Sequence, residues 1–393
     1  MAGIEIITVE KRSELNDFID LPWKIYLDYP KWVPPLKKEV RRLLDPGRHP
    51  FWEFSDRILF LARRGPETVG RIVGIINRHH NEFHNEQAGM WGFFECIDDP
   101  EVAAALFSAV ETWVHRKGMT FIRGPLNPST NYEVGLLIEG FNYPPAIMMT
   151  YNPPYYRTLI ESCHFSKEKD LLAFLIDGDY RLPDWMDHLA KWLTNKGNVH
   201  IRPSRPKDAD SEFALIRKIY NDSWYSNWGF VPLSDHEMKD IQKNVMEFVD
   251  PDMVFFIDYM QEPVAFCVIF PDLNPLLKRL NGRIGLVGLL KYFMYRREIN
   301  GLRLLMFGVK EQYRQLGLPM LAFHHIYEVV RKKEKYRYLE LGWTLEDNDS
   351  VNALAEEAGA KIYKRYRIFR KSLSSENPGY DTPMCNGEMG NIE

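Results

Sequence analysis

The sequence predicts an α/β protein in which two successive domains each form a mixed sheet covered by helices. Three observations lead to this prediction. The chain has 393 residues, too many for one ordinary domain and enough for two. Short β-rich runs alternate with amphipathic helical segments along the chain. The same order of elements, a β-hairpin followed by alternating strands and helices, occurs in both halves.

The first half is predicted to begin its sheet with a hairpin. The β-rich runs 57–63 and 69–77 are separated by Gly65 and Pro66, a pair that is typical of tight turns. A third β-rich run, 89–97, follows at once. These three runs are expected to form neighbouring strands.

A helix is predicted over 101–117. Asp99 and Pro100 precede it; an aspartate caps free N–H groups, and a proline is tolerated in the first helical turn. Gly118 follows the last turn, where a glycine commonly ends a helix. The later elements of this half are, in order, a strand at 120–124, a helix at 155–163 and a strand at 170–176.

The second half repeats this plan after a predicted linker helix, 178–198. Trp185, Leu189 and Leu193 lie on one face of that helix, which stops near Gly197. The second set of elements is a strand from 201, a helix at 212–224, a hairpin of 254–258 with 264–270, a strand at 302–309, a helix at 318–333, a strand at 338–342, a helix at 350–358 and a strand at 361–370.

These elements set the expected domain bounds. The first domain is expected to comprise residues 1–177 and the second 199–373, on either side of the linker helix 178–198. The last residues, 374–393, lack apolar periodicity and are expected to be disordered.

Composition excludes several classes of protein. The net charge of −4 argues against a nucleic-acid partner, because phosphate binding needs clustered Lys and Arg. The four cysteines form no CxxC pair, and the spacing of His79, His80 and His84 matches no zinc pattern, so we expect no metal site and no disulfide framework. The sequence contains neither a secretory signal nor a run of roughly 18 apolar residues. A cytoplasmic protein is therefore expected.

The segment 302–333 carries the clearest chemical signal. An apolar strand leads through a short loop into a long helix, and the first N–H groups of a helix together with its dipole favour an anion. Gly317 carries no side chain at the expected point of approach, and Arg314 adds positive charge. This segment therefore has the features that a diphosphate site needs.

The order Val309, Arg314, Gly317 resembles the acyl-CoA signature of the GNAT superfamily of N-acyltransferases, in which Arg or Gln, two residues, Gly, one residue and Gly or Ala follow the fourth strand. Pro319 stands at the second small residue and donates no N–H. The downstream run 348–360 is similar to the fourth-helix pattern of the superfamily, Asn-x-x-Ala-x-x-x-Tyr-x-x-x-Gly-Phe. Asn348 and Gly359 keep their places in that pattern, and Ala355 stands at the tyrosine.

The resemblance extends well over 200–373 and over 1–177 in the order of elements. It implies two tandem GNAT-like domains, with acyl-CoA or acetyl-CoA as co-substrate and no metal. The residues that it assigns to the co-substrate are Phe307, Val309, Arg314, Gln315, Gly317, Leu318 and Asn348. In such a site, the N–H groups of 307–309 face the thioester carbonyl as it gains negative charge.

Two residues are candidates for proton transfer. Glu340, on the strand beside the co-substrate strand, is the first candidate base, although a strand-end carboxylate equally fits an ion pair. Tyr363 is a candidate proton donor, although a tyrosine on a strand more often has a packing role. Ala355 cannot supply the proton that the tyrosine of the superfamily gives to the departing thiolate.

The first half differs at the corresponding loop. After its strand 89–97, the sequence reads DDPEV, and two carboxylates there would repel a diphosphate. The N-terminal copy is therefore expected to lack the CoA loop. Its expected role is to close or shape the acceptor pocket.

An insertion in the second half suggests the kind of substrate. Residues 275–301 have an apolar centre, 284–295, flanked by basic residues. This segment is too short to span a bilayer, but it can pack between the domains, cover a long acyl chain, or lie on an anionic membrane. The tandem layout with this insertion resembles bacterial GNAT-type enzymes that N-acylate long-chain amines, including ceramide-forming ones. The expected acceptor is a small-molecule or lipid-like amine, and contact with the inner face of the membrane is one expectation.

Two other functional classes remain. Pro319 and Ala355 are compatible with a non-catalytic module that binds CoA or another ligand for regulation. The double fold also resembles the FemABX aminoacyl transferases, although the acidic net charge disfavours their charged tRNA substrate.

Overall fold

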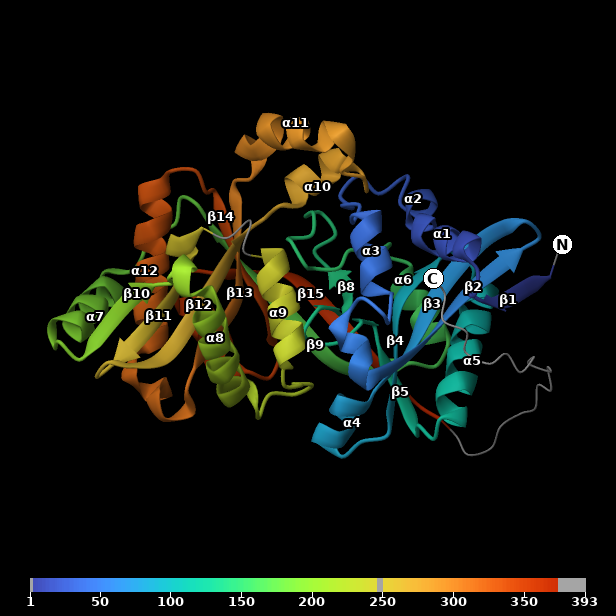
Figure 1. Ribbon diagram of the computed structural model, residues 1–393, viewed down its shortest axis with the longest axis horizontal. Coiled ribbons are helices and arrows are strands. Elements are labelled where there is room, and N and C mark those ends of the chain that lie inside the picture. Colours follow the sequence, from blue (N-terminus) through green and yellow to red (C-terminus); the bar gives the residue numbers. More distant parts are fainter. Residues whose placement is uncertain (1–2, 246–249, 374–393) are drawn as a thin grey trace.

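The structure is a computed structural model that describes residues 3–245 and 250–373. Its main feature is one continuous mixed sheet of 13 strands that runs through both halves of the chain (Figure 1). The mixed α/β class predicted from the sequence is confirmed. The predicted disordered tail, 374–393, lies outside the described residues.

The first half contains the predicted strands and helices with small shifts at their ends. Its elements are β1 (Ile4–Thr8), α1 (Arg12–Asp20), α2 (Pro22–Ile25), α3 (Lys37–Leu43), β2 (Ser55–Arg64), β3 (Glu67–Asn77), α4 (Arg78–His84), β4 (Ala88–Cys96), α5 (Pro100–Arg116), β5 (Phe121–Gly124), β6 (Leu126–Asn127), β7 (Glu133–Val134), β8 (Leu136–Glu139), α6 (Tyr156–Ser162) and β9 (Ser166–Asp177). The strand β1, the helices α1 to α4 and the short strands β6 to β8 were not predicted. The short strands depend on partners that the local sequence does not show.

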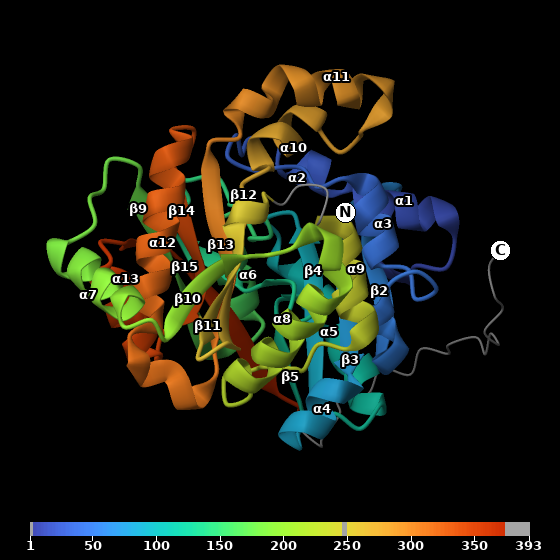
Figure 2. The ribbon, with the colours of Figure 1, turned by 60° about the vertical axis from the view of Figure 1, so that its left-hand side comes forward.

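The second half also follows the predicted order. Its elements are α7 (Asp184–Asn195), β10 (Val199–Pro203), α8 (Ala209–Trp224), α9 (Asp235–Val245), β11 (Val254–Tyr259), β12 (Glu262–Pro271), α10 (Asn274–Leu280), α11 (Gly285–Tyr295), β13 (Gly301–Val309), α12 (Leu318–Lys333), β14 (Tyr338–Leu345), α13 (Asp349–Glu357) and β15 (Lys361–Ser372). The insertion at 275–301 forms the helices α10 and α11, which stand out from the body of the molecule (Figures 1 and 2).

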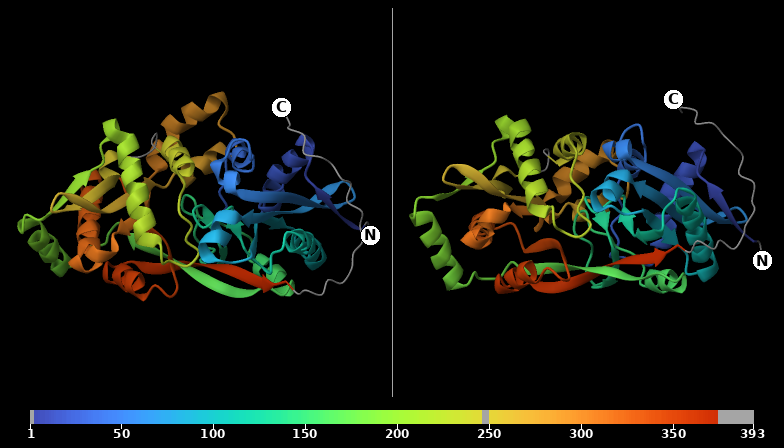
Figure 3. Two further views of the ribbon diagram at one scale, coloured as in Figure 1. Left: turned by 60° about the horizontal axis from the view of Figure 1, so that its bottom comes forward. Right: turned by 90° about the horizontal axis from the view of Figure 1, so that it is seen from below.

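Each half gives its last strand to the sheet of the other half. The strand order is β1-β2-β3-β4-β5-β15-β9-β14-β13-β12-β11-β10, with β8 also beside β15. Strand β9 pairs with β14 of the second half, and β15 pairs with β5 of the first (Figure 3). The two halves therefore share one set of backbone hydrogen bonds. The domain bounds, 1–177 and 199–373, were inferred from the sequence and stay a prediction.

Alternating side chains of the sheet pack on helices of opposite faces. In β11, Phe255 belongs to the core under α7 and α12, whereas its neighbour Phe256 packs with α8 and α9 on the other face. A further core cluster includes Phe18 of the first half and Tyr366 of the second. This shared core holds the two halves together around the cavity described below.

Candidate active site

The second half of the sheet opens between β13 and β14. These strands pair in parallel only from Gly301 with Tyr338 to Leu304 with Leu341. A bulge in the ladder between β12 and β13 leaves Leu305 without a partner at the same level. Because a bulge bends the strand and interrupts pairing, β13 diverges from β14 beyond this point.

The backbone of Phe307 faces this opening. Its carbonyl accepts a hydrogen bond from the indole Nε1 of Trp224 at 3.2 Å, so the carbonyl points away from the paired strand β12. The N–H and C=O groups of one residue in an antiparallel strand point to the same edge. The Phe307 N–H therefore faces the opening too, as expected for a donor to a thioester carbonyl.

Helix α12 begins at the wide end of the opening. A short 3₁₀ turn, Glu311–Leu316, connects β13 to the helix, and no side chain caps the helix N-terminus. Arg314 lines the cavity at this point, and its guanidinium donates to the Ser223 carbonyl at the end of α8, at 2.6 Å. An uncapped helix start beside an arginine is suited to an anion.

The backbone conformation at position 317 favours a glycine, whereas the distance to neighbouring groups does not require one. Its φ of 72° lies in the left-handed region, which favours glycine. A Cβ at this position would lie 3.5 Å from Leu193 and 3.7 Å from Leu189 of α7, which are ordinary contact distances. The expectation that Gly317 clears the point of approach for a diphosphate therefore has to be corrected, because the missing side chain would face α7.

The other predicted co-substrate residues are placed around the same opening. Val309, Gln315 and Asn348 line the cavity, and the Asn348 side chain also accepts from the Val351 N–H to cap α13. Leu318 is fully buried in the core, so only its backbone can contribute to a site.

The corresponding opening in the first half is filled by protein. The Phe93 N–H donates to the Asn127 side chain at 2.6 Å, and a Cβ on Gly92 would come within 1.8 Å of the Leu126 carbonyl oxygen. The start of α5 is capped by Asp99, which accepts from two backbone N–H groups. An internal carboxylate thus lies where an anion would bind, and the absence of a CoA loop from this copy stays a prediction.

A cavity of about 1550 Å³ connects the opening with the first half of the chain. Ligand pockets usually measure about 300–1,000 Å³, so this cavity is large. It extends from Arg314 past β13 to the segment around α2 in the first half. Much of its wall is aromatic or contains methionine, for example Tyr26, Trp32, Met148, Met149, Tyr151 and Met306. Such a wall is suited to an apolar ligand.

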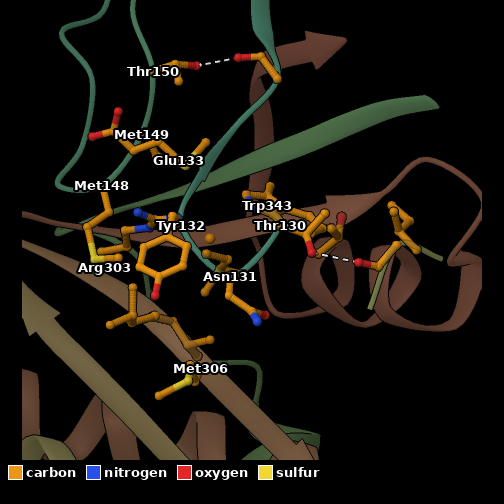
Figure 4. A pocket seen from close by; sticks show the side chains of 18 of the residues that line it. Thr130, Asn131, Tyr132, Glu133, Met148, Met149, Thr150, Arg303, Met306 and Trp343 are labelled. Atoms are coloured by element: carbon orange, nitrogen blue, oxygen red, sulfur yellow. Dashed lines mark hydrogen bonds between the residues drawn. The ribbon is translucent and has the colours of Figure 1, made fainter. Parts of the chain in front are cut away.

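A loop of the first half reaches across into this cavity. This loop comprises residues 129–135, directly after Pro128. Its Thr130 hydroxyl donates to the Gly229 carbonyl at 2.6 Å. The Asn131 side chain accepts from Tyr220 at 2.8 Å, and both contacts lie in the second half. The next residue, Tyr132, donates from its hydroxyl to Glu237 of α9 at 3.2 Å and lines the same cavity as Arg303 and Met306 of β13 (Figure 4). The first half thus forms part of the cavity wall, and its expected role in shaping the acceptor pocket stays a prediction.

Glu133 is the carboxylic acid of this loop. It lies on β7, lines the cavity and is half-buried. Burial raises its pKa to about 7, although Arg303 and the Asn127 side chain partly oppose the rise. A carboxylate of this kind can accept a proton near neutral pH. The sequence alone did not indicate Glu133, because only the tertiary structure brings the loop of one half beside the strand of the other.

Glu340 and Tyr363 lie together behind the cavity wall. The Glu340 side chain has no solvent exposure, and its carboxylate lies 3.5 Å from the Arg303 guanidinium and accepts a hydrogen bond from the Tyr363 hydroxyl. Burial raises the pKa of Glu340, and Arg303 and Lys364 oppose the rise. Neither residue is among those that line the cavity, whereas Arg303 is. Their predicted roles in proton transfer stay predictions.

Substituting Glu340 with alanine is expected to lower the free energy of unfolding by about 3–5 kcal/mol, because the substitution leaves the buried Arg303 without its anion. Denaturant titration measures the change. The matched control is Glu298→Ala, which removes the partner of Arg279 at the surface and is expected to cost less than about 1 kcal/mol. Equal effects of the two substitutions would contradict a structural ion pair at Glu340.

Two kinds of feature are absent from the part of the chain that the structure describes. No three His, Cys, Asp or Glu side chains between residues 3–245 and 250–373 come together as ligands for a metal ion. Over the same ranges, no helix has the length and hydropathy needed to cross a membrane.

The opened strand pair, the uncapped helix and the repeated plan define a tandem GNAT fold. A tandem GNAT protein from the clavulanic acid biosynthesis pathway aligns with 95% of this chain and 100% of its own length, with a TM-score of 0.54 and 10% identity. The GCN5-related glucosamine N-acetyltransferase region of a fungal multi-domain protein aligns with 94% of this chain and 38% of that chain, with a TM-score of 0.55 and 12% identity. These likenesses show the fold.

Two bacterial proteins are similar enough to this chain to show the family to which it belongs. Protein YghO of Escherichia coli (strain K12) is 33% identical over 383 residues, which cover 93% of this chain and 95% of that protein. Bacterial ceramide synthase of Caulobacter vibrioides is 32% identical over 380 residues, which cover 95% of this chain and 98% of that protein. The chain belongs to the family of these two proteins. No protein-family model matches it.

Proposed function

We propose that the protein is an N-acyltransferase that moves an acyl group from acyl-CoA to a lipid-like amine. The observation that carries this proposal is the combination of an uncapped helix start, an opened strand pair and a large apolar cavity that connects them. The relative named Bacterial ceramide synthase supports the choice of a lipid-like substrate. Acyl-CoA supplies the activated acyl thioester.

The diphosphate of CoA is assigned to the start of α12. Backbone N–H groups of Gly317 and Leu318 and the side chains of Arg314 and Gln315 would hold it, because they lie at an anion-favouring helix terminus. Pro319 lacks an N–H group, so the charge of Arg314 matters more at this site than in a loop with a second glycine. Asn348 borders the same part of the cavity.

The reaction is assigned to the opening between β13 and β14. The Phe307 N–H would donate to the thioester carbonyl oxygen as it gains negative charge, with the N–H of Val309 as a second donor on the same strand. The amine nitrogen forms a bond to the acyl carbon, the carbon–sulfur bond breaks, and CoA leaves as a thiolate. The amine gives up one proton to a base, and the thiolate takes one up.

Glu133 is the base that we favour for the amine proton. Glu133 lines the cavity close to Arg303. Arg303 lies on β13, two residues before the bulge at Leu305. Glu340 is separated from the cavity by its pairing with Arg303, so we assign it to the positioning of Arg303, with Tyr363 as its hydrogen-bond donor. A base supplied by the first half would explain why that half is retained without a CoA loop.

The acyl chain or the amine is proposed to be long. Each methylene group that enters an apolar cavity contributes about 0.8 kcal/mol, so long-chain acyl-CoA is expected to exceed acetyl-CoA in kcat/KM by at least about 100-fold. A mass-spectrometric assay over a series of acyl-CoA lengths, with a long-chain amine as acceptor, measures this ratio. A preference for acetyl-CoA would overturn the long-chain proposal and leave the acyltransferase proposal intact.

A matched pair of substitutions tests whether the cavity sets this preference. Met306→Trp adds bulk inside the cavity and is expected to move the optimum to shorter chains. Met260→Trp makes the same change at an exposed turn and is expected to leave the optimum unchanged. An unchanged optimum in both variants would place the acyl chain elsewhere.

Residues 275–301 are proposed to touch the inner face of the membrane. Helix α10 packs against the first half, since the Gly282 carbonyl accepts from the Lys37 N–H and Asn281 accepts from Trp23. Helix α11 instead leaves Leu290, Phe293 and other apolar side chains exposed. We therefore assign the packing between the halves to α10 and the membrane contact to α11.

A further inference from the structure

A second, basic pocket lies beside α11, at the ends of β13 and β14 that are opposite to the proposed CoA site. Strands β13 and β14 are parallel and begin side by side, with Gly301 opposite Tyr338. The residues that precede them therefore meet, and the Arg337 N–H donates to the Asn300 carbonyl at 2.7 Å. The pocket between these two segments measures about 730 Å³.

Four cationic side chains line this pocket. They are Arg296, Arg297, Lys335 and Arg337. Glu334 is the acidic residue among the lining residues, so the pocket carries a net positive charge. Cations gathered around a concave surface attract a phosphate group. The opening between β13 and β14 lies at the other ends of these strands, so this pocket is separate from the proposed diphosphate site.

Exposed apolar side chains lie next to the same pocket. On α11, Leu290, Phe293 and Met294 are 63%, 57% and 68% exposed, and Ile284 before the helix is 55% exposed. Arg283 and Lys291 add positive charge around them, and Tyr292 of the same helix lines the pocket. Apolar side chains beside cations are the features of an element that lies at the surface of an anionic bilayer.

We infer that the pocket of Arg296, Arg297, Lys335 and Arg337 binds the phosphate headgroup of an anionic membrane lipid while the exposed side chains of α11 enter the bilayer interface. This inference deepens the proposed membrane contact of residues 275–301 and rests on it. The charge of the pocket selects the lipid, and the apolar side chains supply the insertion.

The proposed docking surface lies close to the first-half end of the cavity. Pro22 and Pro35 line that end, and their neighbours Trp23 and Lys37 bond directly to the turn between α10 and α11. A lipid-like substrate leaving the bilayer would thus have a short path to the cavity. CoA would reach the cavity from the opposite end, at α12.

Vesicle co-sedimentation of the full chain tests the inference. The wild-type protein is expected to bind vesicles of phosphatidylcholine mixed with phosphatidylglycerol more tightly than vesicles of phosphatidylcholine alone. The double variant Arg297→Gln, Arg337→Gln is expected to lose about 25-fold in binding to the anionic vesicles, because each cation near such a surface contributes a factor of about five. The variant Phe293→Ser, Met294→Ser is expected to lose binding to both kinds of vesicle.

The matched control is Lys207→Gln, Lys239→Gln, which removes two exposed cations elsewhere and is expected to leave binding unchanged. The headgroup pocket is refuted if the wild type binds both kinds of vesicle equally, or if the control variant loses as much binding as Arg297→Gln, Arg337→Gln. The membrane contact of residues 275–301 would still stand in these cases. If the wild type binds neither kind of vesicle, the headgroup pocket and the membrane contact are both refuted. Displacement by inorganic phosphate at constant ionic strength would instead assign the pocket to a free phosphate.

Discussion

Replacing Glu133 with glutamine is expected to lower kcat at neutral pH by about 10²- to 10⁴-fold, the range that a positioned general base contributes. Glutamine keeps the size of the side chain and cannot accept the amine proton. Burial holds the pKa of Glu133 at about 7, so the carboxylate is available as a base near neutral pH. Steady-state kinetics with the preferred acyl-CoA and amine measure the loss.

The pH dependence gives a second, independent measurement on the same residue. A base has to be deprotonated, so wild-type kcat is expected to fall as pH decreases through about 7, the pKa of Glu133. This acid limb is expected to disappear in Glu133→Gln. It is expected to persist in Glu133→Asp, with a lower plateau, because the shorter carboxylate still titrates.

Glu340→Gln serves as the control for this experiment. Since Glu340 does not line the cavity, that variant is expected to keep the acid limb of the pH profile, whatever its loss of stability or rate. If Glu340→Gln abolishes the limb while Glu133→Gln retains it, the assignment of the base reverts to Glu340, as the sequence alone first indicated.

Replacing Arg314 with glutamine is expected to raise the KM for acyl-CoA by about 10- to 100-fold, because a hydrogen bond to a charged group contributes about 1.5–3 kcal/mol. The effect should be large here, since Pro319 leaves the helix start with one N–H fewer. Thermal stabilisation by CoA alone provides the direct measurement, because a ligand that binds the folded state raises Tm by mass action.

Lys310→Gln is the matched control for Arg314→Gln. Lys310 also lies in the loop between β13 and α12, but its ammonium group pairs with Glu262 and does not line the cavity. This variant is expected to keep the wild-type response to CoA. A wild-type protein that is not stabilised by CoA would contradict the proposed site and favour a non-catalytic role.

The two halves are expected to act as one unit. The proposed CoA site lies in the second half, but the loop of residues 129–135 and the proposed base come from the first. The exchanged strands β9 and β15 hold these parts in register, since each pairs with a strand of the other half and the two also pair with each other. The first half thus lines the cavity of the proposed active site, and we expect it to do so without a CoA loop of its own.

The local sequence was sufficient to predict most of the secondary structure, and it also led to the proposed position of an anion site. Alternating apolar residues identified β2, β3 and β11 to β15, and Asp99 with Pro100 marked the start of α5. The loop from Val309 to Pro319 indicated a helix terminus for a diphosphate. These features depend on residues that are close in sequence, where periodicity and capping are decided by local geometry.

The tertiary structure alone decided which residues of the two halves meet. No local pattern indicates that β15 pairs with β5, because strand partners are selected by packing over hundreds of residues. The proposed role of Glu133 rests on its burial beside a strand 170 positions away, and burial is what raises its pKa. For the same reason Glu340, which looked like a base in the sequence, lies behind Arg303. Local chemistry can be read from neighbouring residues, whereas burial and charge depend on the whole fold.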